Sequence, residues 1–212
     1  MRRMKKSYRE IVEILGVPKG TLSSWFNRQE WSAQIQRELD AATRPIHRAR
    51  FAAMARTRSA KFAALREAAR VDARRTFVRH MRNSLFSTGL ALYWGEGEKR
   101  LELGRLRIAN VDPALLWTFT RFLTECCGTP HARLRAWVLL YPDLNEETCL
   151  RYWSRATAIP RSQFRKSQVI IGRSARRRVT HGVCTVFVCE RLLCERLDEW
   201  LRCFREELLS RK

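Results

Sequence analysis

Gly89-Leu-Ala-Leu-Tyr-Trp-Gly-Glu-Gly97 is the stretch of sequence on which the prediction of the fold rests. It lies in an apolar segment, 84–98, that follows a long arginine-rich region and ends in two glycines alternating with two acids. An apolar run that stops at glycine is typical of a buried core helix. We therefore expect a helix that opens a folded domain, with an acid exposed at its end.

The residues that follow this helix alternate between strand-like and helix-like patterns. We expect strands at 105–110, 133–141, 164–171 and 183–189, where apolar residues alternate or run without interruption. Helices are expected to start after Asp112 and Asn145, and an amphipathic helix over 191–209 closes the chain. The prediction for 84–212 is a mixed α/β domain within an α+β protein.

The region before this domain, 31–83, is rich in Arg and Ala, lacks glycine and contains one proline, Pro45. This composition predicts a long basic helix, and residues 46–80 alone would span about 50 Å. Its apolar stripe is thin. Two interpretations stay open: a solvated helix that docks loosely on its neighbours, or a spacer that forms a dimer or follows DNA.

The first thirty residues predict two short helices joined by a tight turn. Ser7 and Glu10 form a capping-box pattern, Gly16 ends the first helix, and Pro18 suits the first turn of the second. The run Tyr8–Phe26 resembles the helix-turn-helix of resolvase-like and repressor-like DNA-binding domains, whose second helix enters the major groove. An ordinary helical hairpin is the alternative. The resemblance implies DNA contacts from Lys19, Ser23, Ser24 and Asn27.

The charge of the chain narrows the class of partner. Its 212 residues include 42 basic and 21 acidic side chains, a formal net charge of +21. Repulsion of this size is relieved by a polyanion, so nucleic acid is the expected partner. An anionic membrane surface and ribosome association are the alternatives. No apolar run could span a membrane, no wide apolar face favours membrane binding, and no secretory signal is present.

The cysteines and histidines point to no metal or disulfide framework. Seven cysteines without CxxC spacing indicate reduced thiols. The four histidines are far apart in the sequence, so no zinc site is expected. These features favour a cytoplasmic, nucleoid-associated protein.

The nine residues quoted above resemble the LAGLIDADG motif of homing endonucleases. Laid over that pattern, Glu96 falls on the catalytic, metal-binding acid and Gly97 on the terminal glycine of the metal site. Ala91 and Gly95 fall where two motif helices pack, whereas Trp94 departs from the pattern by replacing an acid. Paired carboxylates of this kind bind Mg²⁺, which activates water and clamps the scissile phosphate. Because the chain has one motif, the resemblance implies a homodimer with one Glu96 from each subunit.

The resemblance covers roughly residues 84–212 and implies a saddle-shaped sheet that reads bases in the major groove. It is especially close in pattern to bacterial proteins that place a helix-turn-helix before Tyr-Trp-Gly-Glu-Gly and an Asn-x-Asp-Pro helix start, here Asn110-Val-Asp-Pro113. Lys166 is the candidate to support transition-state charge. Each basic residue of the sheet has an alternative interpretation as a solvated strand charge. The candidate DNA contacts are Arg105, Arg107, Arg133, Arg135, Arg165 and Lys166 on the sheet, with Arg173, Arg176, Arg177 and Arg178 in a loop.

The sequence therefore predicts three segments: a helix-turn-helix at 1–30, a basic helical spacer at 31–83, and a LAGLIDADG-like domain at 84–212. The expected function is sequence-specific binding of double-stranded DNA, with a Mg²⁺-dependent site-specific endonuclease as the first hypothesis. A non-cleaving transcriptional regulator is the second, as in a sporulation-regulator family that joins a LAGLIDADG-like domain to a helix-turn-helix. An RNA-binding assembly factor is a third, less favoured class.

Overall fold

The computed structural model describes residues 1–170 and 179–210, and the chain forms two compact units, Met1–Ala63 and Ala64–Lys212. The long helix expected in the middle of the chain is α3 (Glu30–His80), which contributes residues to both units. It continues through Pro45, although proline removes one backbone hydrogen bond from a helix interior. In the described part of the chain, none of the helices is long and apolar enough to cross a membrane.

The first unit contains a 3₁₀ turn, η1 (Arg2–Met4), two short helices, α1 (Tyr8–Leu15) and α2 (Lys19–Phe26), and the start of α3. The capping box is present: Ser7 Oγ accepts from the Glu10 amide at 3.3 Å, and Glu10 Oε2 accepts from the Ser7 amide at 2.7 Å. Gly16 ends α1 with φ of +67°, a conformation that glycine adopts without strain. Ile11 and Leu22 are buried between the helices.

The second unit is a mixed α+β structure, which confirms the fold class at that level. After α3, its helices are α4 (Ser84–Glu96), α5 (Pro113–Arg121), α6 (Glu146–Thr157) and α7 (Arg191–Ser210). Its strands are β1 (Arg105–Asn110), β2 (Arg135–Leu140), β3 (Gln168–Val169) and β4 (Val183–Cys189). Short 3₁₀ or π-helical turns lie at Leu101–Leu103 (η2), Phe122–Cys126 (η3), His131–Arg133 (η4) and Arg161–Gln163 (η5).

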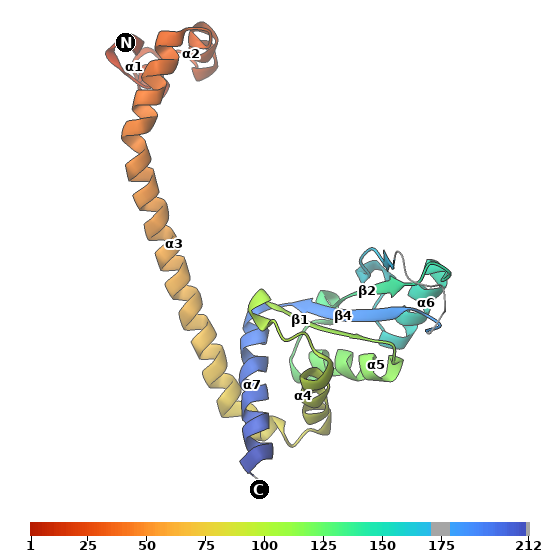
Figure 1. Cartoon of the computed structure of the whole chain (residues 1–212). Coiled ribbons are helices and arrows are strands. Elements are labelled where there is room, and N and C mark those ends of the chain that lie inside the picture. Colours follow the sequence, from red (N-terminus) through yellow and green to blue (C-terminus); the bar gives the residue numbers. More distant parts are fainter. Residues whose placement is uncertain (171–178, 211–212) are drawn as a thin grey trace. The chain divides into compact units, whose positions relative to one another are not determined.

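The sheet has the order β1-β4-β2-β3. Strand β4 is antiparallel to both β1 and β2, while β2 and β3 are parallel. Helices α4 and α5 lie against one face of the sheet, where Leu106, Ile108, Val138 and Val186 are buried (Figure 1). The opposite face presents the alternate residues of each strand, because successive side chains of a strand point to opposite sides.

The two helix starts expected from the sequence are present, and each has a polar cap. Asp112 caps α5 by accepting hydrogen bonds from two amides, at 2.8 and 3.3 Å, and Pro113 occupies the first turn. Asn145 caps α6 through the Thr148 amide at 2.9 Å. These polar caps fix where each of the two helices begins.

The end of α3 is held against α7 by ion pairs and one buried tryptophan. Arg70 pairs with Glu195 at 2.6 Å, and Arg74 pairs with Glu199 at 2.7 Å. Trp200 is fully buried, and its Nε1 donates to the Ala73 carbonyl at 3.1 Å. The last part of the expected spacer, from Ala64 onward, therefore belongs to the second unit.

The strand expected at 164–171 is wrong over most of its length. Strand β3 has only two residues, and Phe164 makes an isolated bridge to Ala136. The preceding 3₁₀ turn is fastened by Gln163, whose side chain donates to the carbonyls of His131 and Leu134. The Arg165 and Ile170 amides donate to the carbonyls of Ala136 and Leu140 of β2, at 2.7 and 3.0 Å, but only Gln168 and Val169 form a strand, and residue 171 lies outside the described residues.

We expect Glu199→Gln to lower the free energy of unfolding at pH 7 by about 1–3 kcal/mol, since it removes a carboxylate bonded to two arginines. Hydrogen bonds from Arg202 and Arg74 lower the pKa of Glu199 in the folded state. A lowered pKa stabilises the fold above the unfolded-state value of about 4.3, and this contribution is lost as pH falls through the folded-state value. The deficit of the variant should therefore shrink between pH 7 and pH 3 in urea unfolding.

The matched control is Glu206→Gln, which removes an exposed partner of the same Arg202. Its effect should stay within about 0.5 kcal/mol, as is usual for exposed ion pairs. Equal decreases in stability in the two variants would contradict a special role for the Glu199 contacts.

Candidate nucleic-acid interface

Two acids at the end of the motif helix α4, Glu96 and Glu98, have different surroundings. Glu96 is the last residue of α4, is exposed, and has no hydrogen-bond or ion-pair partner within the described residues. Gly97 is buried: its amide donates to the Tyr93 carbonyl at 2.9 Å, and it bridges to Ile108 of β1. The chain thus passes from helix to sheet edge within one residue, leaving Glu96 outside and Glu98 inside.

Glu98, the residue after the motif, is the acid that is held by several hydrogen bonds, and sequence reasoning missed it. Its side chain is 7% exposed and accepts from Arg105 Nε at 2.8 Å, Arg105 Nη2 at 3.0 Å and Arg107 Nη2 at 3.2 Å. Arg100 Nη2 lies 3.4 Å from its Oε1. The Arg105 hydrogen bonds hold the pKa of Glu98 below its usual range although burial opposes this. These four residues are called the Glu98 cluster below.

The Glu98 cluster leaves two positive charges uncompensated, because three guanidinium groups face one carboxylate. Arg105 and Arg107 are two residues apart on β1, so both lie on the face of the sheet away from α4 and α5. The signal in the sequence was their spacing: two arginines on one strand face follow Glu98 by one short turn, which allows ion pairs with it.

Aromatic and basic side chains continue this face across the sheet. In the strand register Phe187 of β4 stands between Arg107 of β1 and Arg135 of β2, and Trp137 is paired with Thr185. Phe187, Arg135 and Trp137 are all half-buried. Arg135 folds back to donate to the carbonyls of Ala132 and Leu134, at 2.6 and 2.7 Å.

Three of the expected saddle residues lie outside the strands. Arg133 belongs to η4 and pairs with Glu190 at 3.5 Å. Arg165 and Lys166 lie exposed between η5 and β3, because that strand is shorter than expected. Among the described residues Lys166 has no bonding partner, and no interaction ties it to Glu96. The loop arginines, Arg173, Arg176, Arg177 and Arg178, lie outside the described residues.

The candidate contact residues of α2 line an open cavity in the first unit. Lys19, Ser23 and Asn27 border a cavity of about 490 Å³, and all three side chains are exposed, as is Ser24. The cavity also reaches the start of α3 at Ser32. The outer face of α2 is therefore accessible over its whole length.

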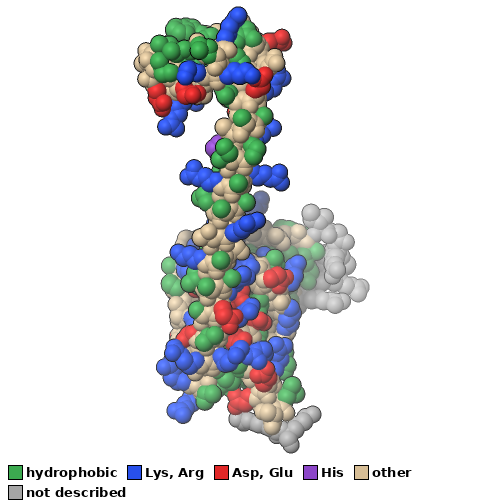
Figure 2. Space-filling model, turned by 90° about the vertical axis from the view of Figure 1, so that its left-hand side faces the viewer, with side chains coloured by type: hydrophobic (Ala, Val, Ile, Leu, Met, Phe, Trp, Pro, Cys, Tyr) green, Lys and Arg blue, Asp and Glu red, His purple; other side chains and the backbone are tan. Residues whose placement is uncertain are grey.

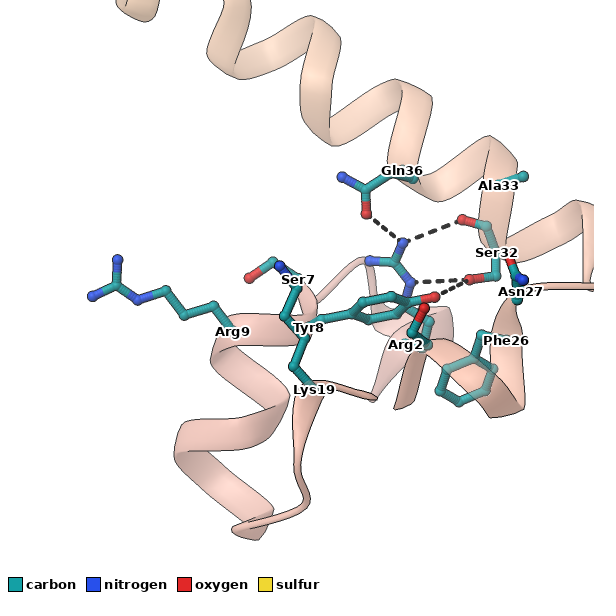
Figure 3. Close-up of a pocket in the computed structure, with 11 residues that line it drawn as sticks. Arg2, Ser7, Tyr8, Arg9, Lys19, Phe26, Asn27, Ser32, Ala33 and Gln36 are labelled. Atoms are coloured by element: carbon teal, nitrogen blue, oxygen red, sulfur yellow. Dashed lines mark hydrogen bonds between the residues drawn. The ribbon is translucent and has the colours of Figure 1, made fainter. Parts of the chain in front are cut away.

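Arg2 lines the same cavity and bonds the start of the chain to α3. The sequence did not indicate this role. Arg2 is 3% exposed and donates to Ser32 Oγ at 3.2 Å, the Ser32 carbonyl at 3.2 Å and Gln36 Oε1 at 2.7 Å. Its guanidinium lies 4.4 Å from the centre of the Tyr8 ring. Figure 3 shows the two side chains next to each other. These contacts join the first turn of the chain, α1 and α3 into one body.

The middle of α3 is a run of basic residues without acids. No Asp or Glu occurs between Asp40 and Glu67, and every residue from 41 to 65 is exposed. Figure 2 shows Lys, Arg and hydrophobic side chains, and no acidic ones, along this part of the helix. Within the described chain, none of its six cations in the first unit has an ion-pair partner: Arg44, Arg48, Arg50, Arg56, Arg58 and Lys61.

The exposed side of α4 carries the small residues expected at a helix crossing. Ala91 and Gly95 are both exposed, and a Cβ added at Gly95 would meet no atom within 4 Å. Trp94 is 44% exposed on the same helix, with its ring 6.2 Å from that of Phe204. The surface of α4 at Gly95 is therefore open.

Within the described residues, no three His, Cys, Asp or Glu side chains lie close enough together to hold a metal ion. Comparisons with protein-family models, with curated proteins and with solved structures found no match to this chain.

The two motif glycines should respond in opposite ways to alanine. A Cβ at Gly97 would lie 2.4 Å from the Tyr93 carbonyl oxygen, so the backbone must shift, and Gly97→Ala should destabilise the protein by about 1–3 kcal/mol. Gly95→Ala adds a methyl group in open space within a helix and should be neutral or stabilise by up to about 1 kcal/mol. Urea unfolding of both variants tests this; changes of the same sign and size would contradict the assigned geometry.

Proposed function

We propose that the protein binds double-stranded DNA sequence-specifically as a homodimer. The observation that carries the proposal is the middle of α3, where six cations stand on a fully exposed helix without one acid. Elsewhere many arginines are paired, as Arg121 is with Glu125. Unpaired cations along a helix match the phosphates of a duplex, which release bound counterions on contact.

The face of α2 favours DNA over a general polyanion. A lysine, two serines and an asparagine on one exposed helix supply both charge and hydrogen-bonding groups for base edges, and the major groove admits an α-helix. These residues remain the candidate base contacts: Lys19, Ser23, Ser24 and Asn27.

The sheet face supports a second contact with DNA. Arg105 and Arg107 are held by Glu98, so their guanidinium groups meet a ligand with little loss of side-chain freedom. Their fixed geometry suits bidentate bonding to guanine or phosphate.

Cleavage of the bound DNA is the first hypothesis for the activity. Exposed Glu96 at the end of α4, beside the small residues Ala91 and Gly95, suits a symmetric crossing of two α4 helices that would bring two carboxylates together. Carboxylate oxygens are preferred ligands of Mg²⁺, which would activate water for attack on the phosphate. One chain offers only one such acid, because Glu98 is engaged by arginines.

A transcriptional regulator that does not cleave DNA is the second candidate. The observation that favours it is Trp94, an exposed aromatic residue where the motif has an acid. Lys166 also lies on an exposed segment outside the strands, without a contact that would place it at a reaction centre.

Replacing Arg48, Arg50, Arg56 and Arg58 with glutamine should weaken duplex binding and flatten its salt dependence. The slope of log K against log salt should fall by about 0.9 for each phosphate that the variant no longer neutralises. A control of equal charge change replaces four paired arginines with glutamine, namely Arg9, Arg121, Arg151 and Arg161. Equal slopes in both variants would assign binding to total charge, and no duplex binding by wild type would refute the proposed function.

Whether the protein cleaves DNA is tested on a duplex selected from a random library. This duplex is incubated with wild type and with Glu96→Gln in Mg²⁺. We expect wild type alone to cleave it, with equal binding by both proteins. Glu102→Gln is the control, since Glu102 is a nearby exposed acid outside the motif, and it should cleave as wild type does. Specific binding without cleavage by any of the three proteins would assign the regulator function instead.

A further inference from the structure

A second basic site lies in the Ala64–Lys212 unit, where the last turns of α3 meet α7. Here a cavity of about 440 Å³ is lined by Asp72, Arg75, Thr76, Arg79, His80 and Arg196. The sequence did not show that these residues meet. Five of them belong to α3, and the sixth lies more than a hundred residues later.

Positive charge in the cavity exceeds negative charge. Asp72 is its single acid and pairs with Arg75 at 3.0 Å. Within the described residues, Arg79 and Arg196 have no acidic partner. The cavity therefore holds two uncompensated guanidinium groups, and an anion placed between them would relieve their repulsion.

Arg196 is fixed in place but incompletely bonded. Its guanidinium carbon lies 4.8 Å from the centre of the buried Trp200 ring. Its Nε is inaccessible to solvent and has no hydrogen-bond acceptor among the described residues. A buried donor without an acceptor costs free energy, so Arg196 has hydrogen-bonding capacity that its own surroundings do not use.

His80 adds a titratable group to the same wall. Its ring stacks on Phe86 at 4.9 Å and meets Trp200 edge-on at 5.6 Å. Burial, then Arg79 and Arg196, lower the pKa of His80, while Asp72 raises it. The imidazole is thus neutral near pH 7 without a ligand, and an anion beside it would favour the protonated form.

We propose that this cavity binds a phosphate group. Planar guanidinium groups bond phosphate oxygens in pairs, and Arg75, Arg79 and Arg196 present three of them around one space. The volume exceeds that of a phosphate ion, so the group can belong to a larger molecule. A phosphate of the nucleic-acid backbone and a free phosphate compound share this chemistry.

The test uses the full chain, inorganic phosphate as the probe, and the His80 ring-proton signal in nuclear magnetic resonance at constant ionic strength. Arg79→Gln removes an exposed cation of the cavity, and Arg82→Gln removes an exposed cation of the same segment outside it. We expect the apparent Kd for phosphate to rise about tenfold in Arg79→Gln and to stay unchanged in Arg82→Gln. Phosphate should also raise the pKa of His80 in wild type.

A duplex arm separates the two sources of phosphate. A lower salt slope for a 20-base-pair duplex in Arg79→Gln than in Arg82→Gln assigns the site to the nucleic-acid backbone. Equal duplex binding with weakened phosphate binding assigns it to a free phosphate compound. The inference is overturned if chloride shifts the His80 signal as much as phosphate does, or if both variants bind phosphate equally. Either result would leave the DNA-binding proposal standing, since that rests on other residues.

Discussion

Electrostatic repulsion among 42 basic side chains, opposed by 21 acidic ones, is the constraint on which this structure depends. Where elements of the second unit pack, an acid stands among arginines, as Glu199 does between Arg74 and Arg202. Where nothing packs, along the middle of α3, acids are absent. A few carboxylates, such as Glu98 and Glu199, are shielded among arginines where elements pack, whereas the middle of α3 carries only positive charge on an accessible surface.

The two glutamates at the end of α4 also differ in whether arginines neutralise them. Two glutamates only two residues apart have opposite surroundings, because Gly97 turns the chain inward between them. Glu98 is committed to the sheet, whereas Glu96 is open to a ligand or a second chain. The motif match in the sequence ends at Gly97 and gives a role to Glu96 alone, so it does not show how Glu98 is held.

Local patterns in the sequence were enough to predict many of the elements. Strand β1 has the expected bounds, and the capping box, the Asp112 cap and the glycine end of α1 are all present. The extent of β3 was missed because the apolar pattern of a segment does not show where it pairs with a neighbouring strand, and the turn before β3 is held by Gln163 bonds to carbonyls about thirty residues earlier. Arg2, Glu98 and the cavity around His80 were missed for a related reason, since each is defined by partners that only the folded chain brings together.

The shielding of Glu98 has a practical consequence for handling the protein. The Glu98 carboxylate is only 7% exposed, although its arginine partners are a third or more exposed, whereas the cations in the middle of α3 have no acidic partner among the described residues and are exposed. Dissolved ions screen exposed charges far more than buried ones. Concentrated salt should therefore release a bound polyanion from the surface while the ion pairs of Glu98 and the fold persist. The protein can then be purified free of nucleic acid without being unfolded.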